Sequence, residues 1–268
     1  MTTKIALLVD HESLQEWERR AVRQVLDDDR LDVEIDLVIV NSDRTQSTTA
    51  ERTSALISEF SLWKVLILLR MVRRSISVSP GYRSRTPIDD IEDFEDTAVN
   101  SYTPISTDGV WNEVPSEAIS ALGNTDIAIR IGFGIIQGKV LDVPTFGVVS
   151  YHHGDMTKYR GRPAGFYEFI DNESVAGVTV QRPSEPFDAG EIVATTHCEI
   201  ADWRSLREVR ERLFRVWPPL LSEVVVRLRD DRPLQKSETL GTIYSTPAAS
   251  DVLRYIRRRI SRTFRYGG

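Results

Sequence analysis

The first forty residues alternate between apolar runs and a helical pattern. Residues 4–10 (KIALLVD) form a continuous apolar run of strand length, and residues 33–41 (VEIDLVIVN) form a second one. Between them, residues 11–29 carry apolar side chains at helical spacing, and Ser13 with Glu16 matches the capping-box pattern. The order strand, helix, strand predicts a parallel sheet with crossover helices.

The middle of the chain predicts further strands joined by short helices. An irregular insertion is expected over residues 75–96, where Pro80-Gly81 marks a turn and an acidic run follows. Helices are expected over residues 115–125 and 162–172, and a short one in GIIQGKVLDVP. The expected strands are residues 126–133, residues 145–152, SVAGVTVQRP and GEIVATTHCEI, the last two joined by a loop over residues 184–189.

The C-terminal part changes character after a long helical stretch. Residues 202–231 have an amphipathic helical pattern that Pro218-Pro219 must break or kink. The segment 244–268 then holds six arginines, with apolar residues near one helical face. We therefore expect a catalytic domain over residues 1–231 and a C-terminal extension over 232–268. Its basic amphipathic helix either makes a weak contact with a membrane surface or a protein partner, or simply docks on the domain.

Composition narrows the class of protein. The 268 residues carry a formal net charge of −6, which argues against general nucleic-acid binding. Cys198 is the only cysteine, so an internal disulfide and a cysteine zinc cluster are excluded, and a cytoplasmic location is expected. The N-terminus is too quickly polar for a signal peptide. The apolar segment 60–72 is shorter than the roughly 20 residues that span a bilayer.

Two adjacent histidines are the first candidates for chemistry. His152 and His153 end the predicted strand 145–152, and Asp155 follows them. Neighbouring residues of a strand point to opposite faces, so the two histidines cannot easily share one ion, and no metal site is expected. Histidines at a strand end can be ordinary hydrogen-bonded residues. However, open parallel sheets bind ligands beyond the carboxyl ends of their strands, where these two lie.

The segment 126–192 resembles the formyltransferase family, the enzymes that use 10-formyltetrahydrofolate. DIAIRIGFGIIQGKVLDVPTFGVVSYH is similar to that family's strand, its Gly-x-Ile-Leu turn and its Gly-x-x-Asn-x-His strand. HHGDMTKYRGRPAGFYEF resembles the family's His-x-Ser-x-Leu-Pro-x-Tyr-Arg-Gly run, and GVTVQRPSEPFDAGEIV its Gly-Val-Thr and Asp-x-Gly-x-Ile segment. The resemblance implies an α/β, Rossmann-like formyltransferase fold, with a mostly parallel sheet and helices on both faces.

The resemblance also implies catalytic and folate-binding residues. His152 matches the catalytic histidine, which acts as acid/base and oxyanion donor, and Asp188 matches its aspartate partner. Ser150 stands where the family usually has Asn, and we expect it to be a secondary oxyanion donor, because a hydroxyl still donates one hydrogen bond. The turn 132–136 and the loop 184–188 are expected to flank the folate pterin, through Phe133, Gly134, Ile135, Ile136, Phe187 and Asp188.

Further residues are candidates for binding the acceptor. They lie in the run after the histidines or at the end of the first strand: Asp10, His11, His153, Asp155, Tyr159, Arg160 and Gly161. Asp10 and His11 could equally cap the first helix. A cluster of arginines could supply a diphosphate site or be solvated charges: Arg70, Arg73, Arg74, Arg83 and Arg85.

The function expected from these residues is transfer of a formyl group from 10-formyltetrahydrofolate to a primary amine. The favoured acceptor is an amino sugar, free or nucleotide-linked, and no nucleic-acid partner is expected. One alternative keeps the folate but makes water the acceptor, which gives a formyltetrahydrofolate hydrolase. Another is a non-catalytic binding or scaffold module on the same fold.

Overall fold

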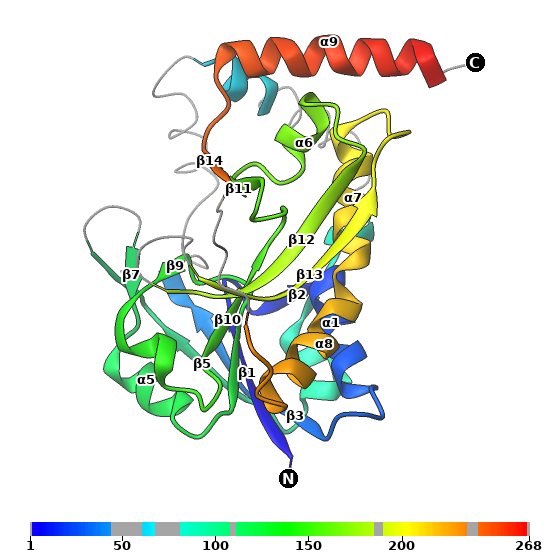
Figure 1. Cartoon of the computed structure of the whole chain (residues 1–268). Helices are drawn as coiled ribbons and strands as arrows, with labels where there is room; N and C mark the ends of the chain where they lie inside the picture. The colour runs from blue at the N-terminus through cyan, green and yellow to red at the C-terminus, as the bar shows by residue number, and fades with distance from the viewer. Residues whose placement is uncertain are drawn as a thin grey trace.

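A computed structural model describes residues 2–43, 61–67, 81–107, 111–184, 190–234 and 241–266 of the chain. Its centre is a seven-stranded sheet in the order β13-β12-β10-β8-β1-β3-β5 (Figure 1). Five strands are parallel, and β12 and β13 run antiparallel at one edge. The strands are β1 (Thr3–Val9), β3 (Val33–Asn41), β5 (Ala98–Tyr102), β8 (Ile127–Arg130), β10 (Val148–His152), β12 (Val175–Arg182) and β13 (Glu191–Glu199).

The strand order reverses beside β1. The chain passes from β1 outward to β3 and β5, and then returns to place β8 and β10 on the other side of β1. In open α/β sheets, ligands bind in the crevice at such a reversal, beyond the carboxyl ends of the strands. The ends of β1, β8 and β10 therefore define where the candidate site lies.

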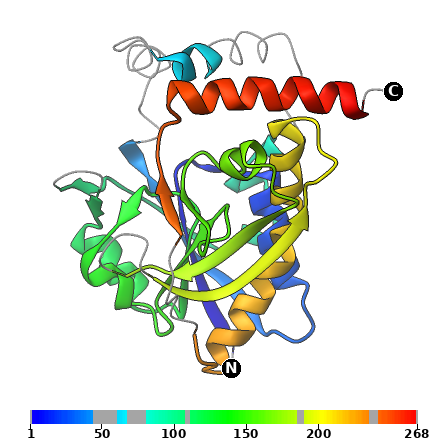
Figure 2. The ribbon, with the colours of Figure 1, turned by 45° about the horizontal axis from the view of Figure 1, so that its top comes forward.

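Helices cover both faces of the sheet, as predicted (Figures 1 and 2). One face packs against α1 (Glu16–Leu26), α7 (Leu206–Val216) and α8 (Pro218–Arg229). The other face meets α5 (Ser116–Leu122) and the short helix η4 (Gly138–Asp142). Trp217, fully buried, fills the junction between α7 and α8, where Pro218 and Pro219 begin the second helix. The predicted helix break is therefore confirmed.

The predicted cap of the first helix is two residues early. The N-cap of α1 is Gln15, whose backbone N–H donates to the Glu18 carboxylate at 2.6 Å in a capping box. Ser13 belongs instead to the short strand β2 (Ser13–Gln15), which pairs with β4 (Arg85–Pro87). This long-range pairing holds Ser13 in extended backbone, so the helix can begin only after it.

The remaining elements are short, and the insertion is irregular over its described part, residues 81–96, as predicted. Residues 75–80 of the insertion lie outside the described residues. The other elements are η1 (Gly81–Arg83), η2 (Ile88–Asp90), η3 (Glu92–Phe94), β6 (Ile105–Ser106), β7 (Trp111–Glu113), β9 (Ile135–Ile136), β11 (Tyr159–Gly161), α6 (Phe166–Ile170), β14 (Thr242–Tyr244) and α9 (Ala249–Tyr266).

The C-terminal extension is built onto the domain at two places. Strand β14 pairs in parallel with β11, and helix α9 packs against α6 through the buried Val252 and Tyr255. The guanidinium of Arg262 is buried, donates to the carbonyl oxygens of Ile200 and Trp203 at 3.0 and 2.5 Å, and lies 5.1 Å from the ring centre of Phe169. These contacts dock one face of α9 on the rest of the structure. The predicted domain boundary at residue 231 stays a prediction.

We predict that Gly161→Ala destabilises the junction between β11 and β14. Gly161 has a φ of +89°, and a Cβ there would lie 2.0 Å from the carbonyl oxygen of Tyr244. Gly138, with a φ of +78° and nothing within 4 Å of its Cβ position, is the matched control, because Gly138→Ala adds only backbone strain. We expect a loss of about 1 kcal/mol in the free energy of unfolding for Gly138→Ala and ~2–4 kcal/mol for Gly161→Ala. Equal losses in urea titrations would contradict the close approach of β14.

Candidate functional site

A row of polar side chains crosses the sheet at the carboxyl ends of β8 and β10. Arg130 of β8 pairs in register with Ser150 of β10, which pairs with Gln181 of β12. Two residues along, His152 pairs with Thr179. Because side chains alternate between faces with a period of two, Ser150 and His152 share one face with Arg130. The sheet register therefore gathers these side chains beside the crevice.

The two adjacent histidines point to opposite faces, as predicted. The ring of His153 lies 5.5 Å from that of Trp17 and 4.5 Å from that of Phe214, on the face covered by α1 and α7. Its Nε2 is buried without a hydrogen-bond partner among the described residues, and burial lowers the pKa of His153 to about 3. His153 is therefore a neutral residue packed in the aromatic cluster, on the opposite face of the sheet from His152, and its expected part in acceptor binding stays a prediction.

His152 is oriented by the turn that follows it. Its Nε2 lies 2.9 Å from the carbonyl oxygen of Tyr159. A carbonyl only accepts, so the proton sits on Nε2, and Nδ1 is the nitrogen that can gain and lose a proton. A Cβ at Gly154 would lie 2.9 Å from this Nε2, and Thr179 Oγ1 donates to the carbonyl oxygen of Gly154 at 3.0 Å. The turn after β10 therefore fits against the imidazole only with glycine at position 154.

Ser150 is bound to the arginine that ends the neighbouring strand. It is fully buried, and Nη2 of Arg130 lies 2.5 Å from its Oγ. A guanidinium can only donate, so the Ser150 oxygen is the acceptor. The serine thus anchors Arg130, and its expected role as a secondary oxyanion donor stays a prediction. Sequence reasoning missed Arg130, whose signal was a charged residue ending an otherwise apolar strand, IAIR.

The turn predicted to flank the pterin is held by Asp10. Phe133 and Gly134 have φ of +69° and +70°. The Asp10 carboxylate accepts from the Phe133 N–H at 2.7 Å, and the Gly134 carbonyl accepts from Nη1 of Arg130. Asp10 thus positions the turn; it neither caps α1 nor offers this oxygen to an acceptor. His11 directly follows it at the same edge of the sheet, and Ile135 and Ile136 continue as β9.

The Tyr-Arg-Gly segment after the histidines contacts other parts of the chain. The Tyr159 hydroxyl donates toward the carboxylates of Asp171 and Glu173, at 3.0 and 3.1 Å, and burial followed by these two charges raises its pKa. Nε of Arg160 donates to the carbonyl oxygen of Gly241 at 2.7 Å, and Gly161 pairs with β14. These contacts attach the C-terminal extension, and an additional role in acceptor binding stays a prediction.

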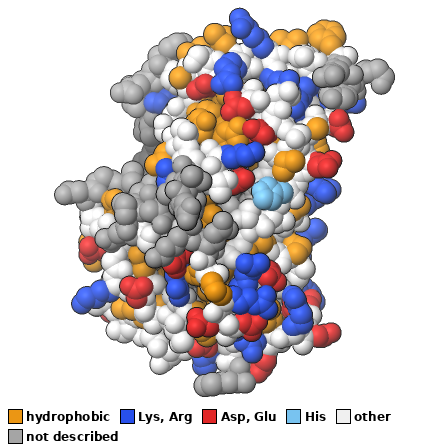
Figure 3. Space-filling view, viewed as in Figure 1, with side chains coloured by type: hydrophobic (Ala, Val, Ile, Leu, Met, Phe, Trp, Pro, Cys, Tyr) orange, Lys and Arg blue, Asp and Glu red, His pale blue; other side chains and the backbone are white. Residues whose placement is uncertain are grey.

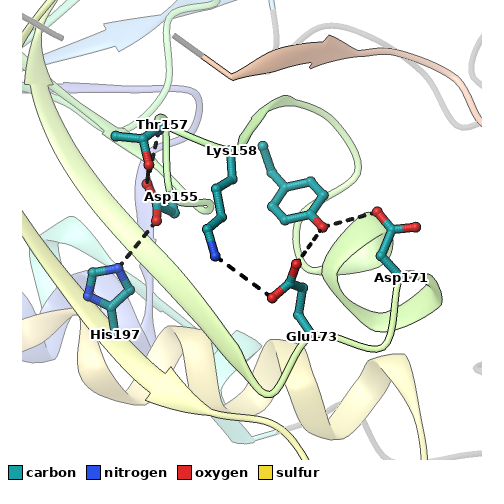
Figure 4. Close-up of polar contacts among 7 residues, drawn as sticks. Asp155, Thr157, Lys158, Asp171, Glu173 and His197 are labelled. Atoms are coloured by element: carbon teal, nitrogen blue, oxygen red, sulfur yellow. Dashed lines mark hydrogen bonds and ion pairs between the residues drawn. The ribbon is translucent and has the colours of Figure 1, made fainter. Parts of the chain in front are cut away.

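Asp155 lies farther along the polar face, beside His197 of β13 (Figure 4). Its carboxylate accepts from the Thr157 backbone N–H and hydroxyl, at 2.9 and 2.6 Å, and lies 3.4 Å from Nε2 of His197. Burial raises the pKa of Asp155, but the hydrogen bonds from Thr157 and His197 outweigh it and hold the pKa below its usual range. An ionised carboxylate here can bind a hydroxyl or amine of an acceptor, which stays a prediction.

Several expected residues fall elsewhere or are not described. Phe187 and Asp188 lie in residues 185–189, outside the described residues, so their roles stay predictions. The same holds for Arg70, Arg73 and Arg74. Nη1 of Arg85 donates to the Ser13 carbonyl at 2.9 Å, and the Arg83 guanidinium lies 5.6 Å from the ring centre of Tyr82. Within the described ranges, no group of three or more His, Cys, Asp or Glu side chains could hold a metal ion.

Comparisons with known proteins agree with this arrangement. The sequence model described as formyl transferase matches residues 106–225. Methionyl-tRNA formyltransferase from Bacillus licheniformis is 29% identical over 122 residues, which are 45% of this chain and 38% of the relative. The matched region thus spans less than two thirds of such curated relatives.

Solved structures show the same fold. An N-formyltransferase from Helicobacter canadensis, in complex with folinic acid and dTDP-3-aminofucose, superposes with a TM-score of 0.55 at 11% identity and covers 98% of this chain and 82% of its own. A sugar N-formyltransferase from Shewanella sp. gives a TM-score of 0.57 at 12% identity and covers 96% of this chain and 87% of its own. At these identities the likeness concerns the fold alone.

The buried histidine makes stability depend on pH. The folded-state pKa of His153, about 3, lies below its ordinary value of 6.5, so the unfolded chain binds more protons between these values. Stability therefore falls as the pH drops through 6.5, by about 2 kcal/mol at pH 5 for this one group. We expect His153→Phe to remove this pH-dependent part of the free energy of unfolding, measured by urea titration at pH 7 and pH 5. His197→Gln, at a half-exposed histidine, should leave it in place. If His153→Phe lost as much stability between pH 7 and pH 5 as the wild type does, His153 would not be the source of this pH dependence.

Proposed function

We propose that this chain transfers a formyl group from 10-formyltetrahydrofolate to a primary amine, and the match of residues 106–225 to the formyl transferase family model supports the proposal. The observation that carries the proposal is the position of His152. It ends β10 on the face shared with Arg130, beside the crevice between β1 and β8, and its Nε2 is fixed on a backbone carbonyl. The imidazole is therefore oriented for proton transfer at Nδ1.

The residues at the crevice fit a folate donor. The turn after β8 is held from three sides, by Asp10, by Arg130 and by Asn112, whose side chain lies against Gly134. Ile131 and Ile135 of this turn are half-buried, so they offer apolar surface to a flat ring. The Helicobacter canadensis structure, with folinic acid bound, has the same fold, which supports the same donor class here.

The chemistry requires a group that moves protons and a group that stabilises negative charge. When bound, 10-formyltetrahydrofolate supplies the formyl carbon, whose oxygen gains negative charge as the amine adds to it. The amine nitrogen forms the new bond to carbon and loses a proton, and the folate N10 is released and gains one. His152 can carry this proton at Nδ1. Asp188, by its resemblance to the family aspartate, is the proposed partner that orients or charges the histidine.

The proposed acceptor is an amino sugar, free or nucleotide-linked. Two observations support it. The sugar N-formyltransferases from Helicobacter canadensis and Shewanella sp. share the fold over nearly the whole of this chain. The net charge of −6 is also unfavourable for binding a tRNA, the acceptor of the curated relatives.

We predict that the protein releases tetrahydrofolate from 10-formyltetrahydrofolate only when a suitable amine is added. The assay uses a panel of amino sugars and nucleotide-linked amino sugars. His152→Ala should lower kcat by about 10²–10⁴, because it removes the proton-transfer group. Arg207→Ala, a change on the exposed side of α7, should leave kcat unaltered.

The other outcomes separate the alternatives. Release without any amine would identify a formyltetrahydrofolate hydrolase. Absence of release with every amine and with water would favour a binding or scaffold module. An undiminished rate in a folded His152→Ala protein would show that the histidine has no catalytic part.

We also infer that α9 contacts an anionic membrane surface. Opposite its docked face it exposes Leu253, Ile256, Ile260 and Phe264, the last 84% exposed, and Arg257 and Arg259 are exposed beside them. Blue and orange side chains accordingly share the upper edge of the molecule (Figure 3). An apolar stripe flanked by arginines matches the charge of an anionic bilayer, whereas it would repel a second copy of itself. Among the described helices, none is long and apolar enough to cross a membrane.

We expect the protein to co-sediment with vesicles of phosphatidylserine and phosphatidylcholine. Phe264→Asp should weaken binding at least fivefold, because it places a charge in the apolar stripe. Ile105→Asp, at an exposed apolar residue of β6 that lies outside α9, is the control. If both changes had the same effect, or if binding were absent at low salt, this contact would be disproved.

A further inference from the structure

Arg130 holds a position that the formyltransferase resemblance does not assign. We propose that Arg130 is the oxyanion-stabilising residue of this enzyme, and that Ser150 is the small anchor that makes room for it. The inference rests on the proposed formyl transfer and names the group that replaces the family's usual Asn. Three features of the described residues carry it: register, space and charge.

The register brings Arg130 to the reaction centre. β8 and β10 are parallel neighbours, and Arg130 pairs with Ser150 at the carboxyl end of both strands. Ser150 and His152 lie two residues apart on the same face, which separates their Cα atoms by about 7 Å. The guanidinium beside Ser150 and the imidazole of His152 therefore lie on the same face of the sheet, near the ends of neighbouring strands.

Space explains why serine stands at position 150. Nη2 of Arg130 lies 2.5 Å from the Ser150 Oγ, so a carboxamide at this position would collide with the guanidinium. Ser150 itself is fully buried, whereas Arg130 is only partly buried. The group nearer the crevice is thus the arginine, and an arginine at 130 and an asparagine at 150 exclude each other.

Hydrogen bonds fix the orientation of this cation. Nη2 donates to Ser150, and Nη1 donates to the carbonyl oxygen of Gly134 in the turn proposed to bind the pterin. The guanidinium therefore joins β10 to the donor-binding turn. It stays charged at every working pH, so it places a fixed positive charge where the formyl oxygen becomes negative. Pre-oriented charge of this kind is effective because no reorganisation is needed during the reaction.

The first test compares changes at the two positions in the tetrahydrofolate-release assay. We expect Arg130→Ala to lower kcat by about 10²–10³ while the KM of the donor changes little, as for the loss of an oxyanion-hole donor. Ser150→Ala should lower kcat much less, since it removes only the hydroxyl that accepts a hydrogen bond from Arg130. Guanidinium ion added to Arg130→Ala should restore part of kcat, which a purely structural role would not produce. Thermal melting and folinic acid binding verify that each variant is folded.

The second test replaces the pair of Arg130 and Ser150 by the asparagine that the family usually has at position 150. Ser150→Asn alone should be nearly inactive, because the carboxamide displaces the guanidinium. Ser150→Asn combined with Arg130→Ala should be at least tenfold more active than either Ser150→Asn or Arg130→Ala alone, since the amide then has room to donate.

The outcomes distinguish this inference from the proposed function. If the wild type transfers formyl but Arg130→Ala keeps its kcat within threefold, or if Ser150→Ala is the more damaging change, Arg130 is not the oxyanion residue. If Arg130→Ala does not fold, Arg130→Lys must retain more activity than Arg130→Met, or the inference fails. A wild type without formyl transfer would overturn the proposed function, and with it this inference.

Discussion

The two-residue period of strand β10 is the constraint on which the site depends. It sends Val149, Tyr151 and His153 into the core beneath α1 and α7, and Ser150 and His152 to the opposite face. The core side chains lock the register of β10, because a slip of one residue would exchange the two sets. The burial of one histidine in an aromatic cluster therefore fixes the direction in which the other one faces.

Two charged side chains, Asp10 and Arg130, hold the turn next to the polar face of β10. Asp10 and Arg130 hold the turn after β8 from two sides, one by accepting from the Phe133 N–H and the other by donating to the Gly134 carbonyl. Each group reaches the turn from the end of a parallel strand, where the strand order reverses. The turn proposed to bind the donor and the cation beside it are thereby both attached to the ends of sheet strands, which fixes their positions before any substrate binds.

Much of the fold could be predicted from the sequence, because apolar runs and helical spacing are local signals. Four of the five parallel strands, β1, β3, β8 and β10, the break at Pro218 and the opposite faces of His152 and His153 follow from such patterns, whereas the short, largely exposed β5 was not predicted. The roles of Ser13, Asp10 and Ser150 could not be predicted, because each is decided by a residue far away in the chain. Ser13 pairs with Pro87, Asp10 binds the Phe133 backbone, and Ser150 accepts from Arg130.

The site was also only partly predictable for a chemical reason. Family resemblance identifies positions, but it does not show which way a hydrogen bond runs. Ser150 could donate or accept in principle, and only the guanidinium at 2.5 Å makes it the acceptor. The Tyr-Arg-Gly segment likewise matches a family motif, yet here its hydroxyl and guanidinium are bound to Asp171, Glu173 and Gly241.

The central claim is that the polar face of β10 directs a formyl group to an amine. The most direct measurement follows ¹³C by NMR from 10-formyltetrahydrofolate labelled at the formyl carbon, in the presence of a nucleotide-linked amino sugar. We expect a labelled formamide on the sugar with the wild type, and none with His152→Gln. Label found only in formate, or left on the folate, would contradict it.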